Sequence, residues 1–318
     1  MTQLKVYNFM GIRRLAVGLS ATLLVISAIS LATQGLQLGL DFTGGTQVEV
    51  GYQSPANVEG VRAQLERAGF EKPVVVHFGS DRDVLIRLQG KPEPEQAISD
   101  EQDGTVKKAL SDKVYEALQS EGADVELRRV DFVGPQIGEE LREDGGLGML
   151  AALIVVMFYV AMRFQLKFAI GAVLALAHDV MITLGFFSLV RLEFDLTVLA
   201  AILAVVGYSL NDTIVVSDRI RENFRKIRNM APLDVINESL SQTLWRTINT
   251  SLTTLLVLLS LFFLGGELIH NFAIALMVGV GVGTYSSIYV AATVMLAMDI
   301  QREDLLVPEK GELVDDLP

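Results

Sequence analysis

Apolar residues in this chain gather in long blocks that alternate with polar stretches. Six blocks reach about 20 residues each, the length that an α-helix needs to cross the hydrocarbon core of a bilayer. They cover residues 15–33, 147–162, 168–190, 196–217, 247–266 and 271–298. The pattern therefore predicts a polytopic α-helical membrane protein with six transmembrane helices.

The segment between the first two blocks has a different pattern. Four β-branched stretches with alternating polarity and two stretches with helical spacing follow one another in the order βαββαβ. The strand-like stretches are 46–52, 73–78, 83–88 and 124–132, and the helix-like ones are 55–68 and 105–120. This order predicts an α+β ferredoxin-like domain, with two helices on one face of an antiparallel sheet. The Pro-rich, acidic stretch 90–104 predicts a loop within it.

Basic residues indicate how the chain crosses the membrane, because short cytoplasmic loops retain Lys and Arg. The amino-terminal segment is basic, and so are the connections 163–167 and 218–246, whereas the short connections on the other side hold only Arg191. Both termini are then cytoplasmic, and residues 35–146 lie outside. In a bacterium this means a multi-pass protein of the inner membrane with a periplasmic domain.

The expected organisation has four parts. They are a cytoplasmic amino terminus with the first span (1–34), the periplasmic domain (35–146), the remaining five spans with a cytoplasmic loop at 218–246 (147–298), and an acidic cytoplasmic tail (299–318). The first span resembles a secretory signal, because Lys5 precedes it and Ser30-Leu31-Ala32 is a possible cleavage site. Its apolar stretch exceeds the roughly 7 to 15 residues of a signal core, which favours an uncleaved anchor.

Composition argues against several classes of function. The net charge is -12, and residues 35–146 hold 22 Asp or Glu against 12 Lys or Arg, which disfavours a nucleic-acid partner. The chain has no cysteine, and the three histidines, His77, His178 and His270, lack metal-ligand spacing. Phosphate-binding, zinc-protease and serine-hydrolase motifs are absent as well. We therefore expect no metal, no cofactor and no enzymatic activity.

Charged residues inside the predicted spans are functional candidates, because each costs about 2.5 to 3.5 kcal/mol to insert. Asp212 lies in the fourth span beside Asn211, and Arg246 opens the fifth. A polar stripe continues from Arg246 at helical spacing through Asn249, Thr250 and Thr253. Pairing with Arg246 would keep Asp212 ionised, whereas burial would favour its neutral form, so the carboxyl could exchange a proton when the helices shift. The alternatives are a static ion pair, or an Arg246 that reaches the membrane interface.

Asp179 is a weaker candidate for proton coupling. It follows His178 near the midpoint of the third span, where a packing role is equally compatible with the sequence. Asp179 and Asp212 also lie on consecutive spans, like the two aspartates of an intramembrane protease, which must nearly touch. Their expected depths differ by roughly 7 Å at 1.5 Å rise per residue, which disfavours a protease.

Small residues mark two further features. The sixth span has a four-residue ladder that lets another helix approach closely, formed by Ala275, Gly279, Gly283, Ser287 and Ala291. Its partner is either another helix of the same chain or another subunit. The segment DFTGGT predicts a tight turn from the first span into the first strand, with Gly44 and Gly45 at positive φ.

Three segments together resemble the signature regions of the SecF family. They are LGLDFTGGTQVEV (38–50), DFVGPQIGEEL (131–141) and VVGYSLNDTIVVSDRIREN (205–223), and they occur in the same order and on the expected sides of the membrane. The signature residues that they contain are Asp41, Phe42, Gly44, Gly45, Gly134, Pro135, Gly138, Gly207, Asp218 and Arg219.

The resemblance implies a role in bacterial protein export. SecF proteins are the smaller integral subunits of the SecD and SecF accessory complex, within the resistance-nodulation-division (RND) superfamily of paired six-helix halves. SecD would supply the second half, and the other expected partners are the SecYEG channel, YajC, unfolded preprotein and membrane lipid. Asp212 matches the proton-coupling aspartate of the family and Arg246 its arginine, so protons are the expected coupling ion.

The resulting hypothesis is that the proton-motive force drives a periplasmic movement that pulls or releases preproteins. Protonation of Asp212 would weaken its pair with Arg246 and repack the helices. One alternative is a proton-driven RND-type exporter of small molecules or lipids, and another is a purely structural scaffold subunit.

Overall fold

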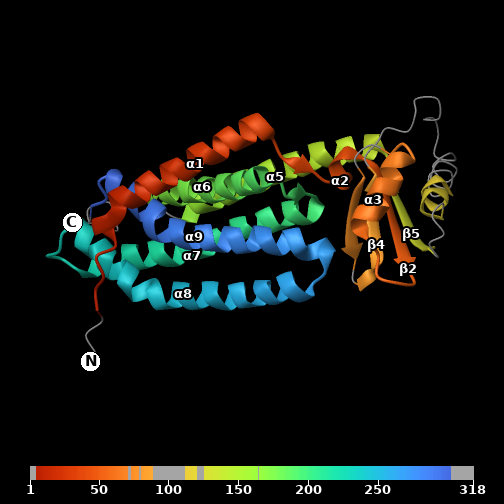
Figure 1. Ribbon diagram of the computed structural model, residues 1–318. Helices are drawn as coiled ribbons and strands as arrows, with labels where there is room; N and C mark the ends of the chain where they lie inside the picture. Colours follow the sequence, from red (N-terminus) through yellow and green to blue (C-terminus); the bar gives the residue numbers. More distant parts are fainter. Residues whose placement is uncertain are drawn as a thin grey trace, which may run out of the picture.

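The computed structural model describes residues 5–70, 73–78, 80–88, 112–119, 125–163 and 165–301. A bundle of long helices forms one part, and an α+β domain lies at one end of it (Figure 1). The start of the first helix and the end of the last lie at the opposite end of the bundle (Figure 1). The expected loop 90–104, residues 105–111 of an expected helix, and most of the expected tail fall outside the described residues.

Six helices are long and apolar enough to cross a membrane, which confirms the predicted number among the described residues. They are α1 (Arg13–Gln34), α5 (Pro135–Arg163), α6 (Leu166–Val190), α7 (Leu196–Lys226), α8 (Pro232–Leu264) and α9 (His270–Ala297). Short 3-10 turns, Met10–Ile12 and Glu267–Ile269, precede α1 and α9.

Three of these helices extend well beyond the predicted spans. The segment 218–246, expected as a loop, is mostly helical, because α7 continues to Lys226 and α8 begins at Pro232. At the other end α5 begins at Pro135, inside the segment assigned to the soluble domain. Hydropathy detects only the apolar part of a helix, so charged turns outside the bilayer escape it. Pro232 at the first turn of α8 is a start signal, since proline tolerates that position.

The small-residue ladder of α9 packs inside this chain. A Cβ atom at Gly279 would lie 2.1 Å from Cγ2 of Val205 on α7, and one at Gly283 would lie 3.1 Å from Cβ of Ser209. The other ladder residues, Ala275, Ser287 and Ala291, are buried. Close helix approach in a membrane depends on such small residues. Of the two partners that the sequence left open, the structure has the intramolecular one.

The soluble domain is an antiparallel sheet of four strands with the order β3-β4-β2-β5. The strands are β2 (Gly45–Tyr52), β3 (Val74–Phe78), β4 (Ser80–Leu88) and β5 (Val125–Val133). Helix α3 (Val58–Arg67) and a helix at 112–119 contribute Leu65 and Leu118 to one core with Val48 and Ile86 of the sheet. Two helices on one face of this sheet are the ferredoxin-like arrangement that the sequence predicts.

Three short elements between the bundle and the domain were not predicted. Strand β1 (Gln37–Leu38) pairs in parallel with β6 (Glu193–Phe194), which connects α6 to α7. Helix α2 (Leu40–Thr43) follows β1 and ends in Gly44 and Gly45, whose φ angles of 69° and 144° confirm the predicted glycine turn. We call residues 37–45 and 191–196 together the joint.

Candidate functional site

Asp212 is buried in the membrane half, level with Arg246 on the next helix. Asp212 precedes Lys226, the last residue of α7, by 14 residues, and Arg246 follows Pro232, the first residue of α8, by 14 residues. At 1.5 Å per residue each lies about 21 Å inside its helix. Asp212 is 3 % exposed, and the guanidinium of Arg246 is the charged group whose field acts on its carboxyl.

One oxygen of Asp212 has no hydrogen-bond partner among the residues that the structure describes. This oxygen, Oδ2, is buried and accepts no hydrogen bond in the described part of the chain. Three hydroxyls there are also buried without a hydrogen-bond partner, those of Thr213 and Ser217 on α7 and that of Thr247, which follows Arg246 on α8. Buried polar groups are nearly always hydrogen-bonded, so each exception calls for an explanation. A carboxyl with a spare oxygen can accept a proton without first breaking a hydrogen bond.

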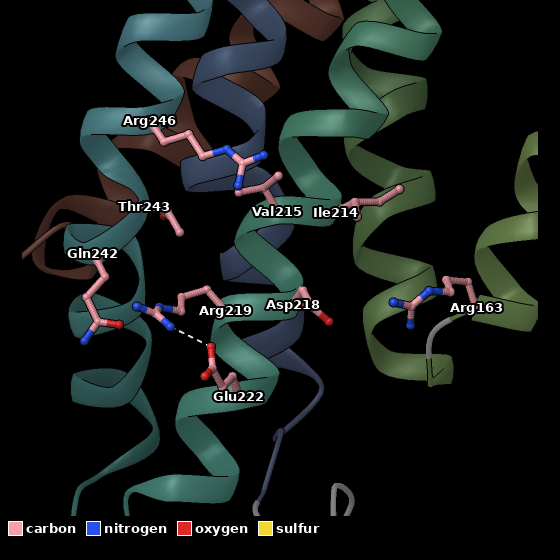
Figure 2. A pocket seen from close by; sticks show the side chains of 9 residues that line it. All are labelled: Arg163, Ile214, Val215, Asp218, Arg219, Glu222, Gln242, Thr243 and Arg246. Carbon is pink, nitrogen blue, oxygen red and sulfur yellow. Dashed lines mark hydrogen bonds and ion pairs between the residues drawn. The ribbon is translucent and has the colours of Figure 1, made fainter.

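The polar stripe of α8 lies on the outside of the chain. Arg246, Asn249 and Thr253 are exposed, and Arg246 extends toward Val215 of α7 (Figure 2). The hydroxyls of Thr250 and Thr253 donate to carbonyl oxygens of α8 itself, at 2.9 Å and 2.8 Å for the shorter contacts. No salt bridge joins Asp212 to Arg246 among the described residues, so the closed ion pair that the sequence suggested does not form here. The exposed stripe can face another molecule.

Helix α7 contributes a second exposed stripe with helical spacing. Gly207, Asn211 and Asp218 are all exposed, and a Cβ atom at Gly207 would meet nothing within 4 Å. We call these residues, together with Arg246, Asn249 and Thr253 of α8, the open face. Polar groups and an unfilled glycine on a membrane helix are typical of a surface that packs against another helix.

A pocket of about 430 Å³ lies between α5, α7 and α8 beside the open face. Its inner end is formed by Arg246 and Val215, one helical turn from Asp212 (Figure 2). Its outer part holds Arg219, whose Nη1 atom donates to Oε2 of Glu222 at 2.6 Å. The mixed charges of this lining can hold water close to the level of the buried acid.

Asp179 belongs to a separate cluster. Its carboxylate contacts His178, Ser209 of α7 and Ser286 of α9, and it makes no hydrogen bond to Asp212 in the described part of the chain. Ser209 precedes Asp212 by one helical turn, so Asp179 contacts α7 one turn away from the position of Asp212. This geometry does not form the shared-proton dyad of an aspartyl protease.

The joint attaches the first signature segment to the start of α7. Oδ2 of Asp41 accepts a hydrogen bond from the backbone N–H of Leu196 at 3.0 Å, and the N–H of Gly39 donates to the carbonyl of Phe194 at 2.8 Å. The rings of Phe42 and Phe194 stack with centroids 6.0 Å apart. Asp41 thereby satisfies one of the free N–H groups at a helix start, where a negative charge is favourable.

An ion pair connects the joint to the sheet of the soluble domain. Arg87 of β4 binds Glu193, and the amide of Asn271 donates to the carbonyl oxygen of Glu193 at 3.1 Å. Burial raises the pKa of Glu193, the Arg87 guanidinium opposes this rise, and the carboxylates of Asp195 and Asp41 add to it. Arg87 and Glu193 lie 106 residues apart, and no sequence pattern singled them out.

The second signature segment packs against the first. A Cβ atom at Gly138 of α5 would lie 2.8 Å from the backbone nitrogen of Gly44, so only glycine allows this approach. Gly134 precedes Pro135, the first residue of α5. The third signature segment lies on α7, which begins at the joint. The resembling segments thus form one continuous route from the soluble domain to Asp212.

Comparisons with known proteins agree with this arrangement. The family model described as "Protein export membrane protein SecD/SecF, C-terminal" matches residues 113–301, and that of the "SecD/SecF GG Motif" matches residues 29–56. "Protein translocase subunit SecF" of Pseudomonas aeruginosa is 50 % identical over 98 % of this chain and 97 % of its own length. The Vibrio alginolyticus protein of the same name is 48 % identical over 99 % of this chain and 98 % of its own length.

A solved structure is similar as well. The crystal structure of SecDF, a translocon-associated membrane protein from Thermus thermophilus, superimposes with a TM-score of 0.77 at 38 % identity over 94 % of this chain. The chain spans 40 % of the length of that SecDF chain. The Super-membrane-facing form of SecDF superimposes with a TM-score of 0.67.

Proposed function

Because the chain belongs to the SecF family of protein translocase subunits, we propose that it forms one half of a SecD and SecF pair that assists the Sec translocase. In this proposal the proton-motive force powers the assistance, and the substrate is a preprotein emerging on the periplasmic side. Protons are the coupling ion in this proposal, and no cofactor takes part.

The observation that carries this proposal is the unpartnered carboxyl oxygen of Asp212 beside the charge of Arg246. A nearby cation favours the ionised form of an acid, and apolar surroundings favour its neutral form. Burial and the distance of Arg246 therefore decide together whether Asp212 holds a proton. Binding of a proton removes the attraction between Asp212 and Arg246, and movement of Arg246 away from Asp212 in turn promotes binding of the proton.

SecD covers the open face in this proposal. An exposed guanidinium at this depth costs about 2.5 to 3.5 kcal/mol on insertion scales, and a partner with an acidic group would lower that cost. Gly207 leaves room for a helix to approach α7 closely. The pair would complete the two six-helix halves of an RND-type bundle, with a SecD carboxylate sharing the proton.

Movement reaches the soluble domain through α7 and the joint. Helix α7 runs without interruption from Leu196, which Asp41 caps, to the level of Asp212 and beyond. A shift of α7 at Asp212 therefore displaces Glu193 and its partner Arg87 on β4. The domain then changes its position against the bundle, which pulls the preprotein or stops it from sliding back.

The available energy is sufficient for such a step. One elementary charge that crosses a potential of 100 mV gains about 2.3 kcal/mol. A hydrogen bond to a charged group contributes about 1.5 to 3 kcal/mol, so one or a few protons match the interactions at the joint.

The orientation in this proposal follows the basic loops, with both termini in the cytoplasm and residues 35–146 in the periplasm of a bacterial inner-membrane protein. SecYEG and YajC would bind the SecD and SecF pair within the membrane.

Two substitutions test the proposal in reconstituted vesicles that contain SecD and the translocation channel. Asp212→Asn and Arg246→Met should each abolish the stimulation of preprotein export by a membrane potential while SecD still co-purifies. Matched controls are Asp234→Asn and Arg228→Met, which alter exposed residues near the connection of α7 and α8. Full stimulation in Asp212→Asn would leave only a scaffold role. Recovery of the chain as a homo-oligomer without SecD would instead support an exporter.

A further inference from the structure

A hydrogen-bonded cluster crosses the bundle at the middle of α6, away from the open face. Asp179 is fully buried and His178 is 4 % exposed. Oδ2 of Asp179 accepts hydrogen bonds from the hydroxyls of Ser209 on α7, at 2.5 Å, and Ser286 on α9, at 2.6 Å. Oδ1 faces Nδ1 of His178 at 2.8 Å. The carboxylate therefore holds three helices together.

The cluster continues on the other side of the imidazole. Nε2 of His178 lies 3.1 Å from the hydroxyl of Ser20 on α1, and this hydroxyl lies 3.0 Å from the phenol oxygen of Tyr285 on α9. The phenol donates its hydrogen to the carbonyl oxygen of Ala16 at 2.7 Å. The rings of His178 and Tyr285 stack with centroids 6.1 Å apart.

Counting hydrogens along this chain fixes its protonation. A hydroxyl has one hydrogen to donate. Tyr285 donates its hydrogen to Ala16, so the contact between Ser20 and Tyr285 must use the hydrogen of Ser20. Ser20 then has none left for His178, and Nε2 of His178 must be the donor. A further hydrogen is needed between Nδ1 and Oδ1 of Asp179, because both are acceptors without it.

The pair of His178 and Asp179 accordingly holds two hydrogens and has no net charge. One hydrogen is on Nε2, and the other lies between the imidazole and the carboxylate. An ionised Asp179 beside a neutral imidazole would hold one proton fewer and leave one contact of the chain without a hydrogen. A pair without net charge is also the form that costs least in a membrane interior.

We propose that His178 and Asp179 form a second proton-binding site of the membrane half, separate from Asp212. Loss of its proton turns Ser20 toward Nε2 and removes the hydrogen between Ser20 and Tyr285. One of the two contacts between α1 and α9 is then lost, while the hydrogen bond from Tyr285 to Ala16 remains and α6, α7 and α9 stay joined through Asp179. The proton count of this site therefore decides whether Ser20 of α1 donates to α9 or to α6.

A groove lies against the site. The groove has a volume of about 290 Å³ and lies between α1, α6 and α9. Its lining is largely apolar, and His178 and Tyr285 are among its polar residues. Tyr289 is the other titratable group there, with its ring centroid 5.3 Å from that of Tyr285. The other side chains that contact the pair among the described residues are the hydroxyls of Ser20 on α1, Ser209 on α7 and Ser286 on α9, none of which carries a charge.

The link to export rests on the proposed function. Ser209 lies one helical turn before Asp212 on α7, so a change at the second site reaches the helix that carries the first. The proton count itself does not depend on that role, since it follows from the contacts within this chain.

Nitrogen-15 NMR of the full chain in liposomes, labelled at its three histidines, tests the proposal. We expect two hydrogens on the pair at neutral pH, one on Nε2 of His178 and one at Nδ1 shared with Asp179. His178→Gln should remove both signals, and His77→Gln, at an exposed strand residue, should leave them unchanged. Tyr285→Phe keeps the stacked ring but frees the hydrogen of Ser20, so the pair should lose one of its two hydrogens more readily as the pH rises. A single hydrogen on the pair in the unmodified protein, or the same loss with pH in Tyr285→Phe as in the unmodified protein, would overturn the proposal.

The outcome is independent of export. If the NMR result holds while Asp212→Asn exports normally, the proton site stands and the proposed function falls. If Asp212→Asn abolishes stimulation while the pair holds a single hydrogen, the proposed function stands and the second site falls.

Discussion

The ion pair between Arg87 and Glu193 should be one of the interactions that hold the soluble domain to α7. The side chain of Arg87 is 15 % exposed and that of Glu193 is 20 % exposed, so solvent screens the pair weakly. Hydrogen bonds between charged groups contribute about 1.5 to 3 kcal/mol, and the residual exposure favours the lower end. We expect a coupling energy of about 1.5 kcal/mol, which corresponds to roughly tenfold in an equilibrium constant.

The two single substitutions should not be equivalent. Arg87→Gln leaves the half-buried carboxylate of Glu193 near Asp195 and Asp41, whose charges repel it. Glu193→Gln removes the pair together with that repulsion and with the cost of burying a charge. At neutral pH, Arg87→Gln should therefore raise the equilibrium constant for opening of the joint about tenfold, and Glu193→Gln should raise it less. In a chain that already carries Glu193→Gln, adding Arg87→Gln should have little further effect.

Hydrogen exchange at the joint measures these effects. The N–H groups of Gly39 and Leu196 donate across the joint, to Phe194 and Asp41, so their protection reports its opening. Arg128→Gln is the control, because it breaks an ion pair with Asp83 elsewhere in the domain. Equal effects of Arg87→Gln with and without Glu193→Gln, or unchanged protection in every variant, would refute a connection through this pair.

Three further predictions follow from the packing and charges. Burial raises the pKa of Glu193, so the folded protein binds a proton there more tightly than the unfolded chain does. The protonated form therefore adds to the free energy of unfolding; this contribution is complete below the ordinary pKa of 4.5 and is lost as the pH rises through the raised pKa. In a profile of stability against pH, Glu193→Gln should remove this decrease. Gly279→Ala should cost about 1 to 3 kcal/mol in detergent-induced unfolding, because its Cβ would meet Val205 at 2.1 Å, and Gly281→Ala on the same helix, with nothing within 4 Å, should cost little. Asp41→Ala should cost about 1 kcal/mol at the start of α7, because the N–H of Leu196 loses its acceptor there. The exchange of the Leu196 amide should become faster, and unchanged exchange would contradict this contact.

The sequence predicts the architecture well because each element carries its own periodic signal. Blocks of about 20 apolar residues define the six spans, and alternation with period two defines the strands. The ends of α5, α7 and α8 were missed for the same reason, since their charged turns lie outside the apolar blocks. The glycine turn at Gly44 and Gly45 could be predicted because only glycine readily adopts both φ angles.

The site was predictable only in part. Asp212 and Arg246 stand out as charges within apolar sequence, and their equal depth follows from helix lengths on either side of a short connection. The outward direction of the stripe at Asn249 and Thr253 depends on which side of α8 packs against α7 and α9, which local sequence does not specify.

The contacts that the sequence did not reveal are all long-range. Arg87 meets Glu193, and Ser20 meets His178, only because the fold brings together residues more than 100 positions apart. None of these side chains forms a local motif, and a single serine in an apolar span gives no signal of its own. Their role becomes visible only when each hydrogen of the buried cluster is assigned.

Infrared difference spectroscopy of the reconstituted SecD and SecF pair tests the central claim most directly, because a carboxylic acid and a carboxylate absorb at different frequencies. We predict that a change of membrane potential makes the carbonyl band of a buried carboxylic acid appear or disappear, and that Asp212→Asn removes this band whereas Asp234→Asn keeps it. A potential-dependent spectrum without such a band, or with the same band in Asp212→Asn, would contradict proton exchange at Asp212.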